Sequence, residues 1–271
     1  HLVLSDRCCI VCLIKMNKLG LLMFATVFSP ALGLASDFSS YKNALQILVE
    51  PEPRPSVGLV ASGFGASGNS FFAAASYTDR DEQTDGNDDD GSIIVGAGFG
   101  DPIDAVGVEV SLGLTSVSTS LWGDGKFADE GNVNLKIHKQ YRPIGTFPVV
   151  SVSVGVSNLT GWGGTLDNPA NTYLAASGIS SLGGLGQYGV MYTLGYGSAV
   201  SDGETSGDLF GGIGVARGDF SASGSFIGDQ INLSANWFPS FFNGAVFSYS
   251  RSDITNTSGL SRNIFSVGYS F

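Results

Sequence analysis

The chain is short of cysteine, of charge and of long apolar runs, and each shortage excludes a class of protein. All three of its cysteines, Cys8, Cys9 and Cys12, lie near the start, so the remainder has no disulfide framework. Charged residues make up only 14% of the 271 residues. After residue 28 no apolar run approaches the length of about 20 residues that a membrane-spanning helix needs. Stability must come from another source, such as a closed hydrogen-bonded sheet.

Basic residues are scarcer than acidic ones. Residues 36–271 carry 10 Lys and Arg against 23 Asp and Glu, a net charge of −13, compared with −11 for the whole chain. Binding to phosphate backbones needs clustered cations. The composition therefore excludes nucleic acid as a partner.

The first 35 residues have the pattern of an export signal. Met16 and Lys18 precede an apolar run over 19–28, and the small-x-Ala end at Ala35 precedes Ser36. This order is typical of a secretory signal peptide over 16–35. We expect 1–15 to be an upstream extension outside the mature protein. The alternative is a cytoplasmic extension that contains the three cysteines.

Glycine is abundant, with 39 residues, and apolar residues alternate with small or polar ones from about residue 69 to the end. The alternation is clearest over 106–115, 132–142, 150–157 and 231–237. Such segments of about ten residues, apolar on one face only, are what a membrane barrel requires. Lys139 interrupts one apolar face near a strand end, where a lysine can extend to the interface.

A soluble β-sandwich also alternates and is the main alternative for the fold. Its outward face is normally rich in charge, whereas the non-apolar face here is mostly Gly, Ser, Thr and Asn. Aromatic residues also gather at the ends of the expected strands, as in the girdles of membrane barrels. These residues are Tyr77, Tyr141, Trp237, Tyr269 and Phe271. The pattern predicts an all-β antiparallel transmembrane β-barrel over 69–271.

The last strand carries a resemblance to a known family. Phe265, Val267, Tyr269 and Phe271 form an apolar face that ends on an aromatic carboxyl terminus. This strand resembles the closing strand of bacterial outer-membrane β-barrels. The resemblance implies that these four residues are the assembly signal read by the barrel-assembly machinery. It further implies an outer-membrane location and contact with outer-membrane lipid and lipopolysaccharide. The stretches 133–138 and 161–164 also resemble uncharacterised barrel proteins of cyanobacteria.

Counting back from Phe271 gives twelve strands, joined alternately by short turns and longer loops. The expected strands are 69–78, 91–99, 104–117, 131–141, 147–157, 172–181, 188–197, 208–217, 219–227, 229–238, 243–251 and 262–271. The connection at 228–229 is tight where a long outer loop is expected. Residues 56–62 either lie outside the barrel or pair with 43–50 to give fourteen strands. We expect twelve, preceded within 36–68 by a short helix around Tyr41–Leu48 and a proline-rich linker.

Four residues are candidate pore-lining groups. Lys136, His138 and Arg142 form a basic ladder on the polar face of one expected strand, and Glu109 lies on the polar face of the preceding strand. Opposed charges in a constriction set ion preference through their field. The alternative is a salt-bridge network that packs the lumen shut.

The acidic stretch 79–91 is a candidate cation site, with seven acids and one base. Asp85, Asn87, Asp88, Asp89 and Asp90 supply the oxygen ligands that Ca²⁺ or Mg²⁺ prefers. The stretch lacks the glycine position and the closing glutamate of an EF-type loop. The alternative is a solvated outer loop without a metal, and we expect no other cofactor.

Catalysis is not favoured, because His138 lies among cations and no Gly-x-Ser-x-Gly elbow occurs. The small residues of the polar face favour an open lumen over a packed one, although 36–55 is placed to fill it. The sequence predicts a porin-like passive pore for ions or small solutes. The alternative is a closed barrel with a structural or surface role.

Overall fold

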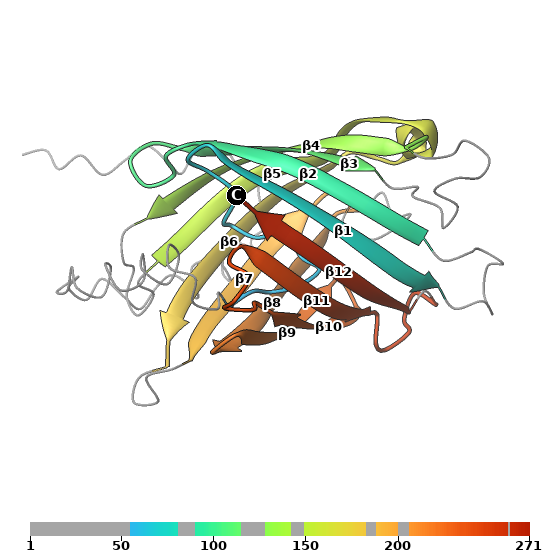
Figure 1. The fold of residues 1–271 in the computed structure, drawn as a ribbon. Helices are drawn as coiled ribbons and strands as arrows, with labels where there is room; N and C mark the ends of the chain where they lie inside the picture. Colours follow the sequence, from blue (N-terminus) through green and yellow to red (C-terminus); the bar gives the residue numbers. More distant parts are fainter. Residues whose placement is uncertain are drawn as a thin grey trace, which may run out of the picture.

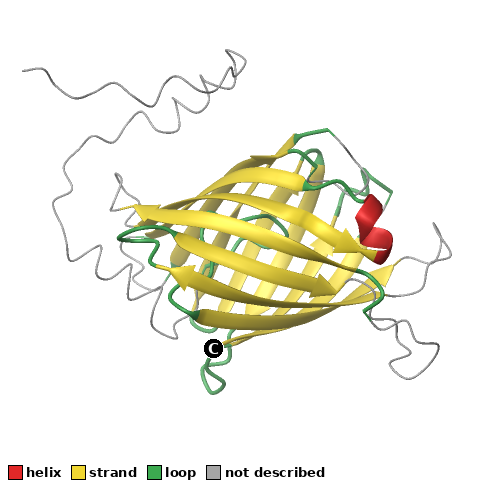
Figure 2. Cartoon of the chain, turned by 90° about the horizontal axis from the view of Figure 1, so that it is seen from above, coloured by secondary structure: helices red, strands yellow, loops and turns green. Residues whose placement is uncertain are grey.

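The computed structural model describes residues 55–80, 90–114, 128–141, 149–182, 188–199, 206–259 and 261–271, which form one closed antiparallel barrel. Figures 1 and 2 show its strands wrapped around a central lumen. The twelve strands are β1 (Ser70–Arg80), β2 (Asp90–Gly100), β3 (Gly107–Leu114), β4 (Gly131–Tyr141), β5 (Val149–Trp162), β6 (Asn171–Ser181), β7 (Gly189–Gly197), β8 (Asp208–Arg217), β9 (Phe220–Ile227), β10 (Gln230–Trp237), β11 (Ala245–Ser252) and β12 (Arg262–Ser270).

Each strand pairs with its sequence neighbours, and β1 pairs with β12 to close the sheet. In this seam Tyr77 lies opposite Phe265 and Ala75 opposite Val267. Closure leaves no sheet edge, which is the condition for strands to cross a bilayer. The prediction of twelve strands is confirmed; a two-sheet sandwich and a fourteen-stranded barrel are both wrong for the described residues.

Alternation places the large apolar side chains on the outside. Representative outward residues are Val95, Leu112, Val154, Leu233 and Val267, with exposed fractions of 39–52%. Inward positions on the same strands are mostly Ser, Gly and Asn. None of the described residues forms a helix long and apolar enough to span a bilayer. The inverted distribution, apolar outside and polar inside, is that of a protein whose surrounding solvent is lipid.

The connections divide the barrel into two ends. Among the described connections, 101–106, 218–219 and 238–244 lie at one end, called the short-turn end, together with the C-terminus, and 163–170 and 253–259 lie at the opposite end. At the short-turn end Trp237 stacks on Phe220 with centroids 6.5 Å apart, and it also contacts Phe241 and Phe247. This cluster is part of the expected aromatic girdle.

Strand β5 continues past the position where the sequence predicts a loop. Asn158, at φ +54°, lies within a register irregularity opposite Val133–Leu135, and its N–H donates to Asn134 Oδ1 at 2.9 Å. Two extra residues of β5 are accommodated in this way, and pairing then resumes at Thr160. The strand therefore ends at Trp162 instead of residue 157, and the short 3₁₀ helix η1 (Gly163–Asp167) follows it.

The loop 253–261 is organised around a buried carboxylate. Asp253 accepts hydrogen bonds from the Thr257 and Ser258 N–H groups, at 2.9 and 2.7 Å, and from the Ser258 and Thr255 hydroxyls. Its own N–H donates to Asn232 Oδ1, and Ile254 N–H donates to the Ile231 carbonyl. These two hydrogen bonds attach the loop to β10. The neighbouring 228–229 turn is tight and leaves space for the loop.

Asp253 gives this loop a pH dependence. Burial alone raises the pKa of the Asp253 carboxyl, but the hydrogen bonds from Ser258, Thr257 and Thr255 outweigh it and lower the pKa below 3.8. The contribution of the Asp253 carboxylate to stability is therefore present above pH 3.8. It is lost as the pH falls through the lowered pKa of the folded state. We expect the Ser258 amide resonance to shift with this acid titration in NMR spectra. In Asp253→Asn the titration should vanish, and persistence of it there would contradict the assignment.

Residues 55–69, called the lumenal segment below, form no strand and lie inside the barrel before β1 begins. Part of this segment is visible in blue through the barrel in Figure 1 and as a green trace within it in Figure 2. Val57, Val60 and Phe64 pack with Ile179 and Met191 of the inner wall. Residues 56–62 are therefore neither a thirteenth strand nor outside the barrel. The expected helix around 41–48 falls outside the described residues.

Candidate functional site

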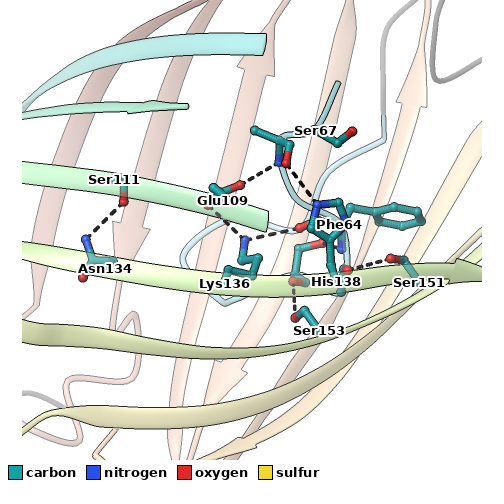
Figure 3. Close-up of polar contacts among 12 residues, drawn as sticks. Phe64, Ser67, Glu109, Ser111, Asn134, Lys136, His138, Ser151 and Ser153 are labelled. Carbon is teal, nitrogen blue, oxygen red and sulfur yellow. Dashed lines mark hydrogen bonds and ion pairs between the residues drawn. The ribbon is translucent and has the colours of Figure 1, made fainter. Parts of the chain in front are cut away.

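Glu109, Lys136 and His138 meet on the inner wall at adjacent positions of β3 and β4 (Figure 3). Lys136 Nζ lies 3.5 Å from Glu109 Oε1 in an ion pair. Glu109 lies opposite Lys136 in the strand register, and Gly107 lies opposite His138. The alternation of β3 and β4 points all three side chains into the lumen, as the sequence predicts.

These three side chains bind the backbone of the lumenal segment. Glu109 Oε2 accepts the Ala66 N–H at 2.7 Å, and Lys136 Nζ donates to the Phe64 carbonyl at 3.3 Å. His138 Nε2 lies 3.0 Å from the Ala66 carbonyl, and because a carbonyl only accepts, Nε2 carries the proton. His138 is 1% exposed, and its buried Nδ1 has no hydrogen-bond partner among the described residues. The ionisable cluster therefore holds the chain's own peptide groups.

Serines of the inner wall continue this binding along the segment. Ser151 and Ser153 donate to the carbonyls of Gly63 and Ser62 at 2.7 and 2.9 Å, and Ser177 accepts the Gly63 N–H at 2.8 Å. On the far wall the Gly58 N–H donates to Ser223 at 3.0 Å, and Ser225 donates to the Gly58 carbonyl at 2.8 Å. Hydroxyl groups at alternate strand positions thus replace the sheet partners that this backbone lacks.

Glycine makes the close contact between segment and wall sterically possible. A Cβ on Gly63 would overlap the Ser151 carbonyl oxygen and the Ser177 nitrogen. In the wall, a Cβ on Gly98 would overlap the Ala66 carbonyl carbon and the Ser67 nitrogen. Glycine is needed at such positions because two backbones approach directly.

Both ends of the lumenal segment lie at the short-turn end. A Cβ at Gly189, the first residue of β7, would contact Pro55, while the Gly68 N–H donates to the carbonyl of Gly100, the last residue of β2. The apex packs deeper, where Val60 and Ala61 contact the cluster of Tyr173, Ala175 and Phe210. The segment therefore enters and leaves the lumen through the same mouth.

The last pore-lining candidate and the acidic residues expected to bind a cation are not described by the structure. Arg142, Asp85, Asn87, Asp88 and Asp89 lie outside the described residues, as does the side chain of Asp90. No group of three or more His, Cys, Asp or Glu suited to a metal occurs in the described ranges.

The four residues of the expected assembly signal occupy outward positions on β12 and at its end. Phe265, Val267, Tyr269 and Phe271 are 50, 44, 37 and 72% exposed. Recognition of this face by assembly machinery stays a prediction. Lys139 also faces outward and donates to the Ile103 carbonyl at 3.1 Å near the short-turn end.

Sequence reasoning missed the role of the serines and of the lumenal segment. It interpreted the small inward residues as space for an open lumen. The detectable signal was the repetition of serine at every second position, as in Ser221, Ser223 and Ser225. The repetition does not indicate which segment the serines bind, because residues 55–69 have no strand or helix period of their own.

The closed sheet, its apolar exterior and its polar interior define a transmembrane β-barrel of the outer-membrane type. A scan of protein-family models finds no match, and no curated protein matches the chain. Among solved structures, the chain is similar to a KdgM porin at 10% identity, covering 74% of this chain and 99% of that one, with a TM-score of 0.48.

Two further solved structures are outer-membrane proteins. The COG4313 outer membrane channel from Pseudomonas putida F1 is 12% identical, with coverage of 77% and 97% and a TM-score of 0.44. The outer membrane protein Omp33 of Acinetobacter baumannii is 8% identical, with coverage of 75% and 98% and a TM-score of 0.43. The assignment to the barrel class rests on the strands and surface described above.

Proposed function

We propose that this protein is a passive outer-membrane channel for small hydrophilic solutes and ions. The observation that carries the proposal is the inner wall, where polar side chains from β3, β4, β5, β6 and β9 turn hydroxyl, amide and charged groups inward. Porins line their water-filled lumen with polar residues in the same way.

The charge of the wall suggests weak ion selectivity. Glu109 and Lys136 lie 3.5 Å apart and offset each other's field, and the serines around them are uncharged. We therefore expect neutral polar solutes and both signs of small ion to pass.

Catalysis gains no support from the geometry. The Nε2 of His138 contacts the Ala66 carbonyl, its Nδ1 has no partner, and neither nitrogen has a hydrogen bond to a serine or a carboxylate among the described residues. A general base oriented by a third group, as nucleophilic catalysis requires, is therefore absent from this part of the chain.

Removal of the lumenal segment tests the channel directly. A mature chain lacking residues 36–67 keeps all twelve strands and the Gly68–Gly100 backbone hydrogen bond. We expect this variant to give discrete conductance steps in planar bilayers, with a mean conductance at least about tenfold above that of the full mature chain. Circular dichroism checks that the barrel has formed. If the folded variant gives no conductance in planar bilayers, the channel proposal is wrong and the structural role is favoured.

A further inference from the structure

We propose that the lumenal segment is a removable stopper, held in a binding site on the inner wall formed by Glu109, Lys136, His138 and the wall serines, and that its release opens the barrel. This inference rests on the proposed channel and adds its regulation. The wall site binds the segment mainly through its backbone, since most of its hydrogen bonds go to peptide N–H and carbonyl groups.

The position of the segment permits release without unfolding the barrel. The ionisable residues that bind it lie near the short-turn ends of their strands: Glu109 is the third residue of β3, and His138 is the fourth from the end of β4. Both ends of the segment also lie at that mouth. A loop that enters and leaves by one opening can withdraw as a loop, without threading a chain end through the sheet.

The bonding of the segment differs from that of the barrel. Strand β1 is joined to β2 and β12 by continuous backbone ladders. The lumenal segment instead binds mainly through side chains of the wall, with each hydrogen bond contributing only about 0.5–1.5 kcal/mol net because water replaces it on release. Its apolar contacts are confined to small clusters around Val57, Val60 and Phe64.

The three ionisable residues of the wall bind the lumenal segment at one place. Glu109, Lys136 and His138 surround the peptide groups of residues 64–66, so acceptor, donor and imidazole act on neighbouring units of one backbone. Hydrogen bonds that involve a charged group are stronger than neutral ones. This cluster acts as a latch on the limb that returns to β1, and loss of the Lys136 ammonium weakens it.

A reversible disulfide provides the test of closure. The hydroxyl oxygens of Ser62 and Ser177 lie 3.3 Å apart, so cysteines at these positions place two sulfurs within bonding reach. In the full chain with Cys8, Cys9 and Cys12 changed to serine, we expect oxidation of the Ser62→Cys/Ser177→Cys pair to lower the mean conductance at least about tenfold. Reduction should restore it.

A second pair serves as the matched control. Ser56 and Ser221, also 3.3 Å apart, lie where the segment enters the lumen. Oxidation of Ser56→Cys/Ser221→Cys tethers only that end and should leave openings that do not depend on reductant. Equal conductance of the oxidised and reduced Ser62/Ser177 pair would overturn the stopper. If the variant lacking 36–67 conducts but the reduced full chain shows no openings, release of the lumenal segment is overturned while the channel proposal stands.

A readout without conduction tests the latch. A single Ser62→Cys reports release through its labelling by a hydrophilic maleimide. Lys136→Met should raise the labelling rate about tenfold, corresponding to the roughly 1.4 kcal/mol of a charge-assisted hydrogen bond. Lys139→Met, on the same strand but facing outward, should leave the rate unchanged. An unchanged rate in Lys136→Met would remove the latch from the proposal.

Discussion

Replacement of Gly63 by valine is expected to expel the lumenal segment from a barrel that is otherwise intact. The new Cβ overlaps the Ser151 carbonyl oxygen and the Ser177 nitrogen, which are backbone atoms of β5 and β6. Those strands are fixed by their mutual ladder and by β4 and β7, so the wall cannot yield by more than a few tenths of an ångström. The segment must leave, because it is the weaker partner.

The predicted consequence is a channel that stays open. In planar bilayers Gly63→Val should approach the mean conductance of the chain lacking residues 36–67, while the unfolding transition of the barrel shifts little. Gly224→Ala is the control, since its added Cβ meets only Leu233 Cδ2, at 3.8 Å. A Gly63→Val chain that conducts like the unaltered protein would show that the segment does not obstruct the lumen.

Arginine in place of Val267 is expected to destabilise the barrel by about 2–4 kcal/mol, the cost of a cation on the lipid face near the midplane. Val267 is 44% exposed and lies in the middle of β12 between Ala75 and Phe247 of the neighbouring strands. Urea unfolding from lipid vesicles measures the loss as a change in midpoint at constant slope.

The neighbouring residue separates the lipid effect from a general effect of arginine. Ser266 occupies the preceding position and faces the lumen opposite Ser76 and Ser248. Ser266→Arg should therefore cost much less than Val267→Arg, because its side chain enters a polar interior. Equal losses for the two variants would contradict the membrane placement of this face.

The barrel could be predicted from the sequence because the alternation that marks its strands is periodic. The expected bounds 131–141 and 208–217 coincide with β4 and β8, and most other strand ends differ by one to three residues. A period of two fixes which face each residue takes, and turn residues mark the ends. Strand β5 is the largest miss: Asn158 leaves the period at a left-handed residue, and pairing resumes afterwards to Trp162.

The candidate site was predictable only in part. Inward placement of Glu109, Lys136 and His138 follows from alternation along β3 and β4. Their partners do not, because residues 64–66 are recognised through peptide groups that every sequence carries. The contacts also join positions 43 to 72 residues apart without pairing as a sheet, so no local sequence pattern indicates them. The alternatives of a charged constriction and a packed network therefore remained open at that stage.

The seam between β1 and β12 dictates when this barrel can be completed. Every other strand pair joins neighbours in the chain, whereas this pair joins Phe72 to Ser270. The last residue takes part, since the Phe271 N–H donates to the Phe71 carbonyl at 2.8 Å. Closure must therefore wait until β12 is available, and a chain without β12 would present two bare edges to the bilayer. Strand β12 thus selects for assembly those chains that contain all twelve strands, because no shorter set of these strands can become edgeless.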